Sequence, residues 1–373
     1  MNAHVITVAV TAAMIVATGL ANTFSSSSLS IVHLRSSQLL QSFSSKIMII
    51  GNRKDGFLLG TLPVMRSHFR LLTRRGAIKA LVIVGVSAVS YVPGRSEAKP
   101  KSTSNQNPSA RTDNKTPVWL TLRTTPELPS PSRTDWLTVN GTRIFFAQFG
   151  GEGPQVLLLH GGLANSNYWG LQVQELAKSF SVTVMDTRGH GRSPVMSRDF
   201  SYKKFAEDVA GLLDFLQIPV VSIVGWSDGA ITGLQLAMMQ PDRVSKLFAF
   251  GANSSVNGLK KDQTGIFASF VKRCQTEYKQ LSPAPEKWSQ LVDGLRVMWR
   301  TEPNFTKQKL ETLKVPTAIS DGDHDEIIKL EHTKRMASEI PNAQLVIQHE
   351  VSHFAMLQNP SQFNKAIIDF LTA

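Results

Sequence analysis

Cysteine is nearly absent from this chain of 373 residues, which contains only Cys274. A single thiol cannot form an intramolecular disulfide or a zinc site made of cysteines. The residue lies in a segment that we expect to be helical, so we interpret it as a small buried apolar side chain rather than a reactive one. The shortage of cysteine is compatible with export but does not demonstrate it.

Acidic residues are scarce in the first third of the chain. Residues 1–134 contain 16 of the 40 lysines and arginines but only four of the 28 acidic residues. Residues 135–373 therefore carry 24 side chains of each charge. Because the whole excess of +12 lies in the N-terminal third, we interpret it as a property of a targeting region. It does not indicate a nucleic-acid-binding face, and we expect no nucleic-acid partner.

Apolar runs long enough for a membrane span are also missing. The run of 16 residues at 5–20 fits the core of a signal peptide better than a span. A second signal of twin-arginine type occupies about residues 65–98. It begins with Arg74-Arg75, continues through an apolar stretch, and ends in Ser96-Glu97-Ala98, with small residues where a signal peptidase needs them.

These features predict that residues 1–98 are a targeting region and that the protein is exported to the periplasm or the medium. We expect no membrane contact beyond this segment. Because a signal of this kind normally stands at the N-terminus, we expect translation to start at Met65. Residues 1–64 would then be an over-extended gene prediction. An organellar presequence is the alternative, because residues 21–50 are rich in serine and poor in acids. Residues 99–134 are polar and rich in proline and serine, so they predict a flexible linker.

From residue 135 the pattern becomes that of a folded α/β domain ending at residue 373. A hairpin is predicted at Asn140-Gly141. Apolar segments typical of buried strands alternate with amphipathic helical segments; the expected strands include 181–186, 220–225, 244–252, 316–321 and 343–348, and the expected helices 169–180, 202–217 and 228–240. This alternation predicts a mostly parallel central sheet with helices on both faces. Residues 256–312 are helical throughout and predict a helical cap inserted over the sheet, or else an ordinary pair of crossover helices.

The segment VGWSDGAITG, residues 224–233, places Ser227 between Gly225 and Gly229 in a G-x-S-x-G pattern. An apolar strand precedes it and a helix follows. Such a turn is sharp and lifts one hydroxyl out of the sheet, so Ser227 is a candidate nucleophile. The pattern alone is a weak signal, because a serine hydroxyl needs a base to accept its proton.

The base and its acid follow in the chain order that this architecture requires. His353 lies in EVSHFAML, between the last strand and the final helix. Asp325 lies in SDGDHDEI, just beyond the strand 316–321, and we expect it to orient the imidazole. Asp321 and Asp323 are rival acids; we expect Asp321 to hydrogen-bond the turn and Asp323 to face water.

An oxyanion hole is predicted from two loops. The glycines of LLLHGGLANSNYW allow a close backbone approach, so the N–H of Gly162 or Leu163 is one donor, and the N–H of Asp228 is the other. We interpret His160 as an anchor for this loop. The glycine-rich turn 186–193, DTRGHGRS, lacks the lysine of a phosphate-binding loop and is interpreted as structural. No metal site and no cofactor is expected.

The order HGG, DTRGHGRS, GWSDG, GDHD and SHF resembles the α/β-hydrolase superfamily over about residues 135–373. GWSDGAITGLQLAMMQPDRVSKLFAFGAN is similar to the biphenyl-hydrolase-like group of α-amino-acid ester hydrolases. The resemblance implies that the carboxylate of Asp228 recognises a substrate ammonium group. The alternative is that Asp228 contributes only its backbone N–H, as an oxyanion-hole donor. The sequence departs from that group at His160-Gly161-Gly162 and at Ala230. The resemblance does not extend to the cap, residues 256–312, so it does not define the substrate preference.

These observations favour a serine hydrolase that cleaves a small-molecule carboxylic ester, or a related acyl compound, through an acyl-enzyme. Haloalkane dehalogenase and epoxide hydrolase are disfavoured, because enzymes of those kinds carry an aspartate at the position of Ser227. A carbon–carbon bond hydrolase of ring-cleavage products, a cofactor-free perhydrolase and a non-catalytic binding protein remain as alternatives. The sequence predicts no oligomeric state.

Overall fold

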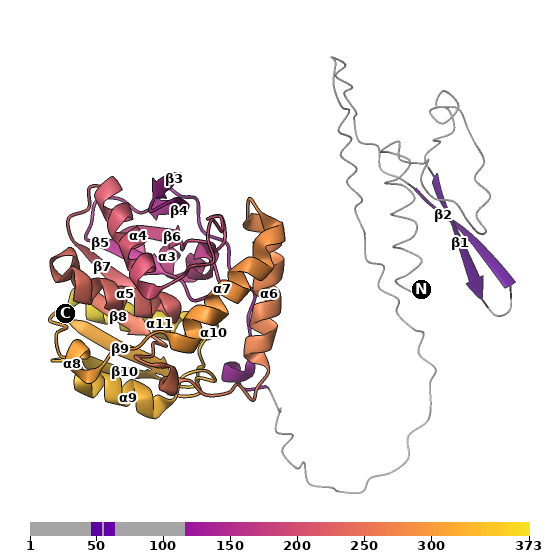
Figure 1. Cartoon of the computed structure of the whole chain (residues 1–373). Coiled ribbons are helices and arrows are strands. Elements are labelled where there is room, and N and C mark those ends of the chain that lie inside the picture. Colours follow the sequence, from indigo (N-terminus) through magenta and orange to yellow (C-terminus); the bar gives the residue numbers. More distant parts are fainter. Residues whose placement is uncertain (1–45, 54–55, 64–115) are drawn as a thin grey trace, which may run out of the picture. The chain divides into compact units, whose positions relative to one another are not determined.

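The computed structural model of the chain describes residues 46–53, 56–63 and 116–373, which fall into two units divided at Gln106. In the first unit, β1 (Lys46–Arg53) and β2 (Gly56–Pro63) form an antiparallel hairpin (Figure 1). The predicted signal at 65–98 lies outside the described residues. In the part of the chain that the structure describes, no helix combines the length and the apolarity needed to cross a bilayer.

The second unit is built on an eight-stranded sheet with the order β10-β9-β8-β7-β5-β6-β4-β3. Its strands are β3 (Arg133–Val139), β4 (Thr142–Phe149), β5 (Gln155–Leu159), β6 (Ser181–Asp186), β7 (Val221–Trp226), β8 (Val244–Phe250), β9 (Thr317–Gly322) and β10 (Gln344–Gln348). The strands from β10 to β6 run parallel, whereas β4 pairs antiparallel with both β6 and β3. The mostly parallel sheet confirms the predicted fold class.

Local sequence explains the two kinds of strand. The central strands β5, β7 and β8 are almost continuously apolar, because helices cover both faces of the parallel part of the sheet. The edge pair β3 and β4 is joined at Asn140 and Gly141, both with positive φ, 47° and 72°. That combination is the tight two-residue turn whose twist suits a hairpin.

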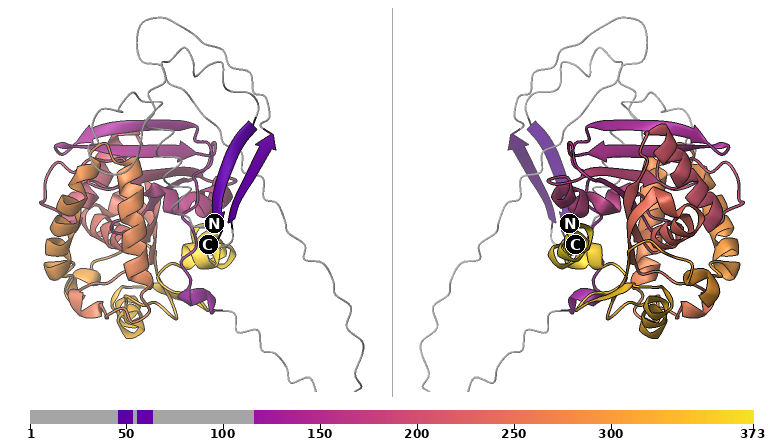
Figure 2. Two further views of the ribbon diagram at one scale, coloured as in Figure 1. Left: turned by 90° about the vertical axis from the view of Figure 1, so that its right-hand side faces the viewer. Right: turned by 90° about the vertical axis from the view of Figure 1, so that its left-hand side faces the viewer.

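Helices cover both faces of the sheet (Figure 2). They are α3 (Gly170–Leu176), α4 (Tyr202–Phe215), α5 (Asp228–Met239), α9 (Leu330–Glu339), α10 (Ala355–Gln358) and α11 (Pro360–Thr372). Helices α3 and α11 pack together on one face, and α4 and α5 pack together on the other. Two helix starts follow from the sequence: the side chains of Ser201 and Asn359 accept amide hydrogen bonds at the first turns of α4 and α11.

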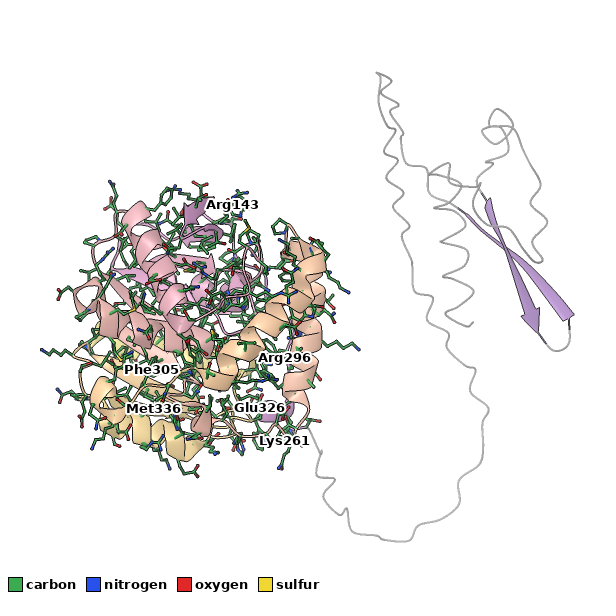
Figure 3. All side chains as sticks on the ribbon, in the orientation of Figure 1. Arg143, Lys261, Arg296, Phe305, Glu326 and Met336 are labelled. Carbon is green, nitrogen blue, oxygen red and sulfur yellow. The ribbon has the colours of Figure 1, made fainter. Side chains whose placement is uncertain are left out.

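The predicted helical cap is inserted between β8 and β9. It contains α6 (Ile266–Leu281), α7 (Trp288–Thr301) and the short α8 (Lys307–Leu310). Each long cap helix buries one apolar stripe and turns charged side chains outward; Arg296 of α7 lies at the surface, as does Arg143 of β4 (Figure 3). Cys274 is buried on α6, which confirms its interpretation as a core residue.

The structure differs in part from the predicted linker at residues 99–134. Residues 117–128, which we name the N-terminal strap, lie against the domain, and β3 begins at Arg133 rather than at residue 135. The physical reason is that Leu122 and Leu128 contact the hydrophobic core, although the surrounding composition is polar. A compositional bias toward proline and serine therefore did not prevent ordered packing here.

Candidate active site

Ser227 occupies the sharp turn between β7 and α5. Its backbone has φ 55° and ψ −121°, which is an unusual conformation for a residue other than glycine. Such conformations cost about 1–3 kcal/mol and persist where the surroundings enforce them. The N–H of Ser227 donates to the carbonyl of Phe250 at 2.8 Å, and its own carbonyl accepts from Ile231 at 3.0 Å. The turn is thus bonded to β8 on one side and to α5 on the other.

The two glycines of the G-x-S-x-G pattern are required by close packing. A Cβ on Gly229 would lie 2.1 Å from the carbonyl oxygen of Leu159 at the end of β5. A Cβ on Gly225 would lie 2.5 Å from the backbone of Ala230. Both contacts are with backbone and cannot be relieved by rotating a side chain. The absence of side chains therefore lets α5 start directly against the ends of β5 and β7.

Asp325 and His353 form a buried pair. The Nδ1 atom of His353 lies 2.6 Å from Oδ2 of Asp325, and both side chains are only 2% exposed. The other oxygen of Asp325 accepts from the amides of Ile327 and Ile328, each at 2.7 Å. With both carboxylate oxygens occupied, the imidazole is held in one orientation with Nδ1 toward the acid.

The pair shifts both pKa values toward the charged forms. Burial by itself would raise the pKa of Asp325, but the charge and hydrogen bond of His353 outweigh it and hold that pKa below its usual range. Burial would lower the pKa of His353, but Asp325 outweighs burial and raises it above its usual value. An imidazole in this setting is a stronger proton acceptor than a free one.

Gly251 brings the serine turn and the acid–base pair together. Gly251 follows Phe250, which accepts the hydrogen bond from Ser227. A Cβ on Gly251 would lie 2.8 Å from Cε1 of His353 and 3.8 Å from Oδ2 of Asp325. The three predicted residues therefore converge at the ends of β7, β8 and β9. No hydrogen bond joins the Ser227 hydroxyl to His353 in the part of the chain described here; such bonds often tighten only with substrate.

The rival acids have other partners. Asp321 is fully buried, accepts the N–H of Gly322 at 2.9 Å, and accepts the hydroxyl of Thr333 at 2.6 Å. It bonds the turn as predicted. Burial first, and the neighbouring Asp325 second, raise the pKa of Asp321 well above its usual range. Asp323 does not simply face water, because it is half-buried and pairs with Nδ1 of His349 at 3.2 Å.

The loop after β5 lies against the serine turn. A Cβ on Gly161 would be 3.2 Å from Cβ of Ser227, and a Cβ on Gly162 would be 2.4 Å from Oδ2 of Asp228. Leu163, the next residue, is buried and has a positive φ of 65°. The backbone therefore passes next to Ser227 at Gly161 and next to Asp228 at Gly162, immediately before Leu163. This is the loop from which the sequence predicts one oxyanion-hole donor.

His160 anchors this loop. Its Nε2 accepts the N–H of Thr187 at 3.0 Å, so that nitrogen carries no proton, and Nδ1 donates to the carbonyl of Gly161 at 2.8 Å. Burial lowers the pKa of His160 and keeps the ring neutral, against the opposing charge of Asp186. The imidazole thus connects the loop after β5 to the turn after β6, as the interpretation of His160 required.

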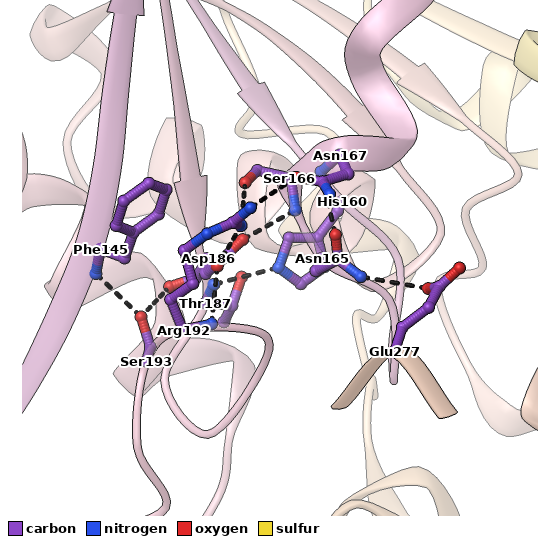
Figure 4. Close-up of polar contacts among 10 residues, drawn as sticks. All are labelled: Phe145, His160, Asn165, Ser166, Asn167, Asp186, Thr187, Arg192, Ser193 and Glu277. Carbon is purple, nitrogen blue, oxygen red and sulfur yellow. Dashed lines mark hydrogen bonds and ion pairs between the residues drawn. The ribbon is translucent and has the colours of Figure 1, made fainter. Parts of the chain in front are cut away.

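The turn 186–193 also holds the loop after β5 in place (Figure 4). Asp186 accepts from the amide of Ser166 at 2.7 Å and from the amide and guanidinium of Arg192 at 2.7 and 3.1 Å. The hydroxyl of Ser193 donates to the carbonyl of Asp186 and accepts from the amide of Phe145. These bonds join the loop after β5, the turn 186–193 and strand β4 around a buried carboxylate, which agrees with a structural role for the turn.

Two residues that the sequence analysis missed hold the side chain of Asp228. The hydroxyl of Tyr202 donates to Oδ1 at 2.7 Å, and the indole N–H of Trp299 lies 2.9 Å from Oδ2 and 3.1 Å from Oδ1. Burial raises the pKa of Asp228 to about 6, against these hydrogen bonds and the charge of His353. No local motif marks these donors, because they come from α4 and from the cap helix α7.

Glu326 is a further residue that the sequence analysis did not single out. It is buried, and its Oε2 accepts the backbone N–H of His353 at 3.2 Å. Burial raises its pKa, followed by the repulsion of Asp325. Within residues 116–373 and the β1–β2 hairpin, no group of three or more histidine, cysteine or acidic side chains is arranged to hold a metal ion.

Comparison with known proteins identifies the class. A family model described as alpha/beta hydrolase fold matches residues 154–289. A Homo sapiens protein named serine hydrolase BPHL is 29% identical over 250 residues, which cover 63% of this chain and 85% of that protein. A Pseudomonas putida protein is named 2-hydroxy-6-oxononadienedioate/2-hydroxy-6-oxononatrienedioate hydrolase 2. It is 27% identical over 255 residues, which cover 59% of this chain and 89% of that protein.

A solved structure agrees on the fold. The structure of a thermophilic esterase from Thermogutta terrifontis matches with a TM-score of 0.54 at 22% identity, and the match covers 65% of this chain and 98% of the esterase. Together with the eight-stranded sheet and the serine turn, these matches show that the chain has the α/β-hydrolase fold and is an α/β-fold hydrolase. Among proteins with that fold it resembles the biphenyl-hydrolase-like serine hydrolases.

Proposed function

We propose that the chain is a serine hydrolase that cleaves a carboxylic ester through an acyl-enzyme. The observation that carries the proposal is the buried His353–Asp325 hydrogen bond beside the strained turn at Ser227. In the proposed reaction the Ser227 hydroxyl attacks the ester carbonyl while Nε2 of His353 accepts its proton. Asp325 keeps Nδ1 protonated and stabilises the imidazolium that forms.

The second half of the proposed reaction releases the products. The tetrahedral intermediate collapses, His353 returns the proton to the departing alkoxide, and the alcohol leaves. A water molecule then attacks the acyl-enzyme with His353 again as base, and the carboxylic acid is released with Ser227 restored. The amides of Gly162 or Leu163 and of Asp228 would hold the developing oxyanion, each donor contributing about 3 kcal/mol to transition-state stabilisation.

The carboxylate of Asp228 indicates which class of ester would be preferred, if it contacts the substrate. The group lies next to Ser227, is buried, and has a pKa of about 6, so it is mostly ionised at neutral pH. Burial outweighs the charge of His353 and the hydrogen bonds at this carboxylate, so a substrate ammonium group that approaches would stabilise its ionised form further. We therefore propose α-amino-acid esters as preferred substrates, in line with the resemblance to the biphenyl-hydrolase-like group.

Hydrolysis of a small panel of esters tests both the role of Ser227 as nucleophile and the preference for α-amino-acid esters. The full chain and Ser227→Ala are assayed on p-nitrophenyl acetate, phenylalanine methyl ester and its N-acetyl derivative. Ser222→Ala is the matched control, because Ser222 lies on β7 and its hydroxyl bonds only Ser245 at the surface. Loss of turnover in Ser227→Ala alone supports the nucleophile. A preference for the free amine over its N-acetyl form supports Asp228, and equal rates on the two would refute that part.

A carbon–carbon bond hydrolase is the second candidate. It would use the same three residues, and the relative from Pseudomonas putida is named as a hydrolase of 2-hydroxy-6-oxononadienedioate and 2-hydroxy-6-oxononatrienedioate. Turnover of such a compound without Ser227-dependent turnover of any ester would favour this candidate.

We also propose export through the signal at residues 65–98. Replacing Arg74 and Arg75 by lysine should leave the protein inside a bacterial host that exports the parent chain. Unchanged export of the doubly substituted chain would refute a twin-arginine signal.

A further inference from the structure

The N-terminal strap, residues 117–128, contacts the loops that carry Asp325 and His353, which we call the catalytic pair. It contains the short helix η1 (Val118–Leu120), drawn in purple in Figures 1 and 2, which packs against α10. The strap precedes the first strand of the domain, so the sheet itself does not require it. Its contacts with three separate parts of the domain therefore need an explanation.

The first contact reaches the loop of the acid. The ring of Trp119 stacks on the imidazole of His324, with centroids 3.9 Å apart and an interplanar angle of 6°. His324 immediately precedes Asp325, and its backbone N–H donates to the carbonyl of Val351 at 3.1 Å. The stacked ring thus covers the point at which the loop of the acid is bonded to the loop of the base.

The second contact reaches the loop of the base. The side-chain amide of Gln358 donates to the carbonyl of Thr121 at 2.8 Å and to the hydroxyl of Ser352 at 2.9 Å. The oxygen of the same amide accepts the backbone N–H of Ser352 at 2.7 Å. Ser352 immediately precedes His353. One buried glutamine therefore bonds the strap and the residue beside the base at the same time.

The third contact joins the strap to the cap. Arg273 on α6 donates to the carbonyls of Leu122 and Arg123, the former at 2.8 Å. Thr125 donates to one oxygen of Glu277, also on α6, and the other oxygen of Glu277 accepts from Asn165 at 3.2 Å. Asn165 lies two residues beyond Leu163, so this chain of bonds leads to the predicted oxyanion loop.

We infer that the N-terminal strap positions the catalytic pair, and that Trp119 is a positioning residue for Asp325 and His353. The inference rests on the proposed function. One contact falls on His324, next in sequence to the acid, and a second reaches Ser352, next in sequence to the base, through Gln358. The third contact ties the cap to the same strap. A catalytic group must be held within a fraction of an ångström of its working geometry, and residues that touch its neighbours supply that restraint.

The test uses three substitutions of one residue in the full chain. Trp119→Ala removes the stacked ring, Trp119→Leu keeps apolar bulk without a ring, and Trp119→Phe keeps an aromatic face over His324. Trp136→Ala is the matched control, because this tryptophan is 42% exposed on β3 and packs on Phe145, far along the sheet from β9. Each protein is assayed for kcat and KM on p-nitrophenyl acetate and for its melting temperature.

The expected result is a split between rate and binding. Trp119→Ala and Trp119→Leu should lower kcat about tenfold with KM changed less than about twofold, since small displacements of a catalytic group cost rate rather than affinity. Trp119→Phe should restore most of kcat, and Trp136→Ala should keep the parent value. A fall in melting temperature with unchanged kcat in both the alanine and leucine variants would overturn the inference, because the strap would then only stabilise the fold.

A titration of His353 separates this inference from the proposed function. In chains labelled with 15N-histidine, NMR reports the ionisation of His353, assigned with His353→Gln, whether or not esters are hydrolysed. Displacing Asp325 should lower the pKa of His353 in Trp119→Ala, while the other facing carboxylates, Glu326 and Asp228, remain in place. An unchanged titration in the alanine and leucine variants would refute the positioning role even if every ester proved to be a poor substrate.

Discussion

Replacing Gly251 by alanine would press a methyl group against the candidate base. Gly251 has φ 63°, and an added Cβ would lie 2.8 Å from Cε1 and 3.0 Å from Nδ1 of His353. Ordinary contacts begin at 3.4 Å, so the ring would have to move by roughly 0.6 Å. The ring cannot move freely, because Nδ1 is bonded to Asp325 at 2.6 Å.

Two costs follow from this geometry. Alanine in the left-handed region costs about 1–2 kcal/mol of stability. Misplacing a catalytic group by about 1 Å can cost on the order of a hundredfold in rate, so a shift of roughly 0.6 Å should lower kcat by about tenfold to a hundredfold. The stability cost is common to any left-handed glycine, whereas the cost in rate is specific to the contact with His353.

Gly141→Ala is the control for this prediction. Gly141 has φ 72° in the hairpin turn, and an added Cβ would meet no atom within 4 Å. Both variants are compared by urea unfolding and by kcat on p-nitrophenyl acetate. Both should lose stability, Gly251→Ala the more because of its contact with the buried His353, and only Gly251→Ala should lose rate. Equal kcat in the two variants would refute the argument that backbone space at Gly251 sets the position of His353.

Asp325→Asn should lower kcat by about 10³–10⁴-fold and move the acid limb of the pH–rate profile to lower pH, because the charge that raises the pKa of His353 is lost; an unmoved limb would argue against the pairing. Folding raises the pKa of Asp228 to about 6, so protonation of Asp228 stabilises the folded chain. This contribution to the free energy of unfolding is fully present below about pH 4 and is lost as the pH rises through 6; it amounts to at most about 3 kcal/mol. Urea unfolding at about pH 4.5 and 7.5 should show this loss in the parent and not in Asp228→Ala; identical pH dependence would contradict it. Arg188→Met leaves the buried Asp208 without its ion-pair partner and should cost about 3–5 kcal/mol in urea unfolding, and a cost below about 1 kcal/mol would show that Asp208 is neutral in the fold.

The sequence determined the architecture and the order of the candidate residues. Apolar segments alternating with amphipathic ones are a local signal, because a strand buried on both faces and a helix buried on one face need different spacings of apolar residues. The expected strand at 181–186 matches β6, and the expected helix at 202–217 contains α4. Ser227, Asp325 and His353 could be selected because each follows a strand in the parallel sheet, and the carboxyl ends of parallel strands meet at one edge.

Only the tertiary structure decided what surrounds those residues. Trp299 and Tyr202 bond Asp228 from 71 and 26 residues away, and no periodic pattern relates such positions. The strap was predicted as a linker from its composition, yet Gln358 bonds it from 237 residues away in the sequence. Hydrogen bonds between distant elements depend on the docking of whole helices and loops, which local propensity and spacing do not encode.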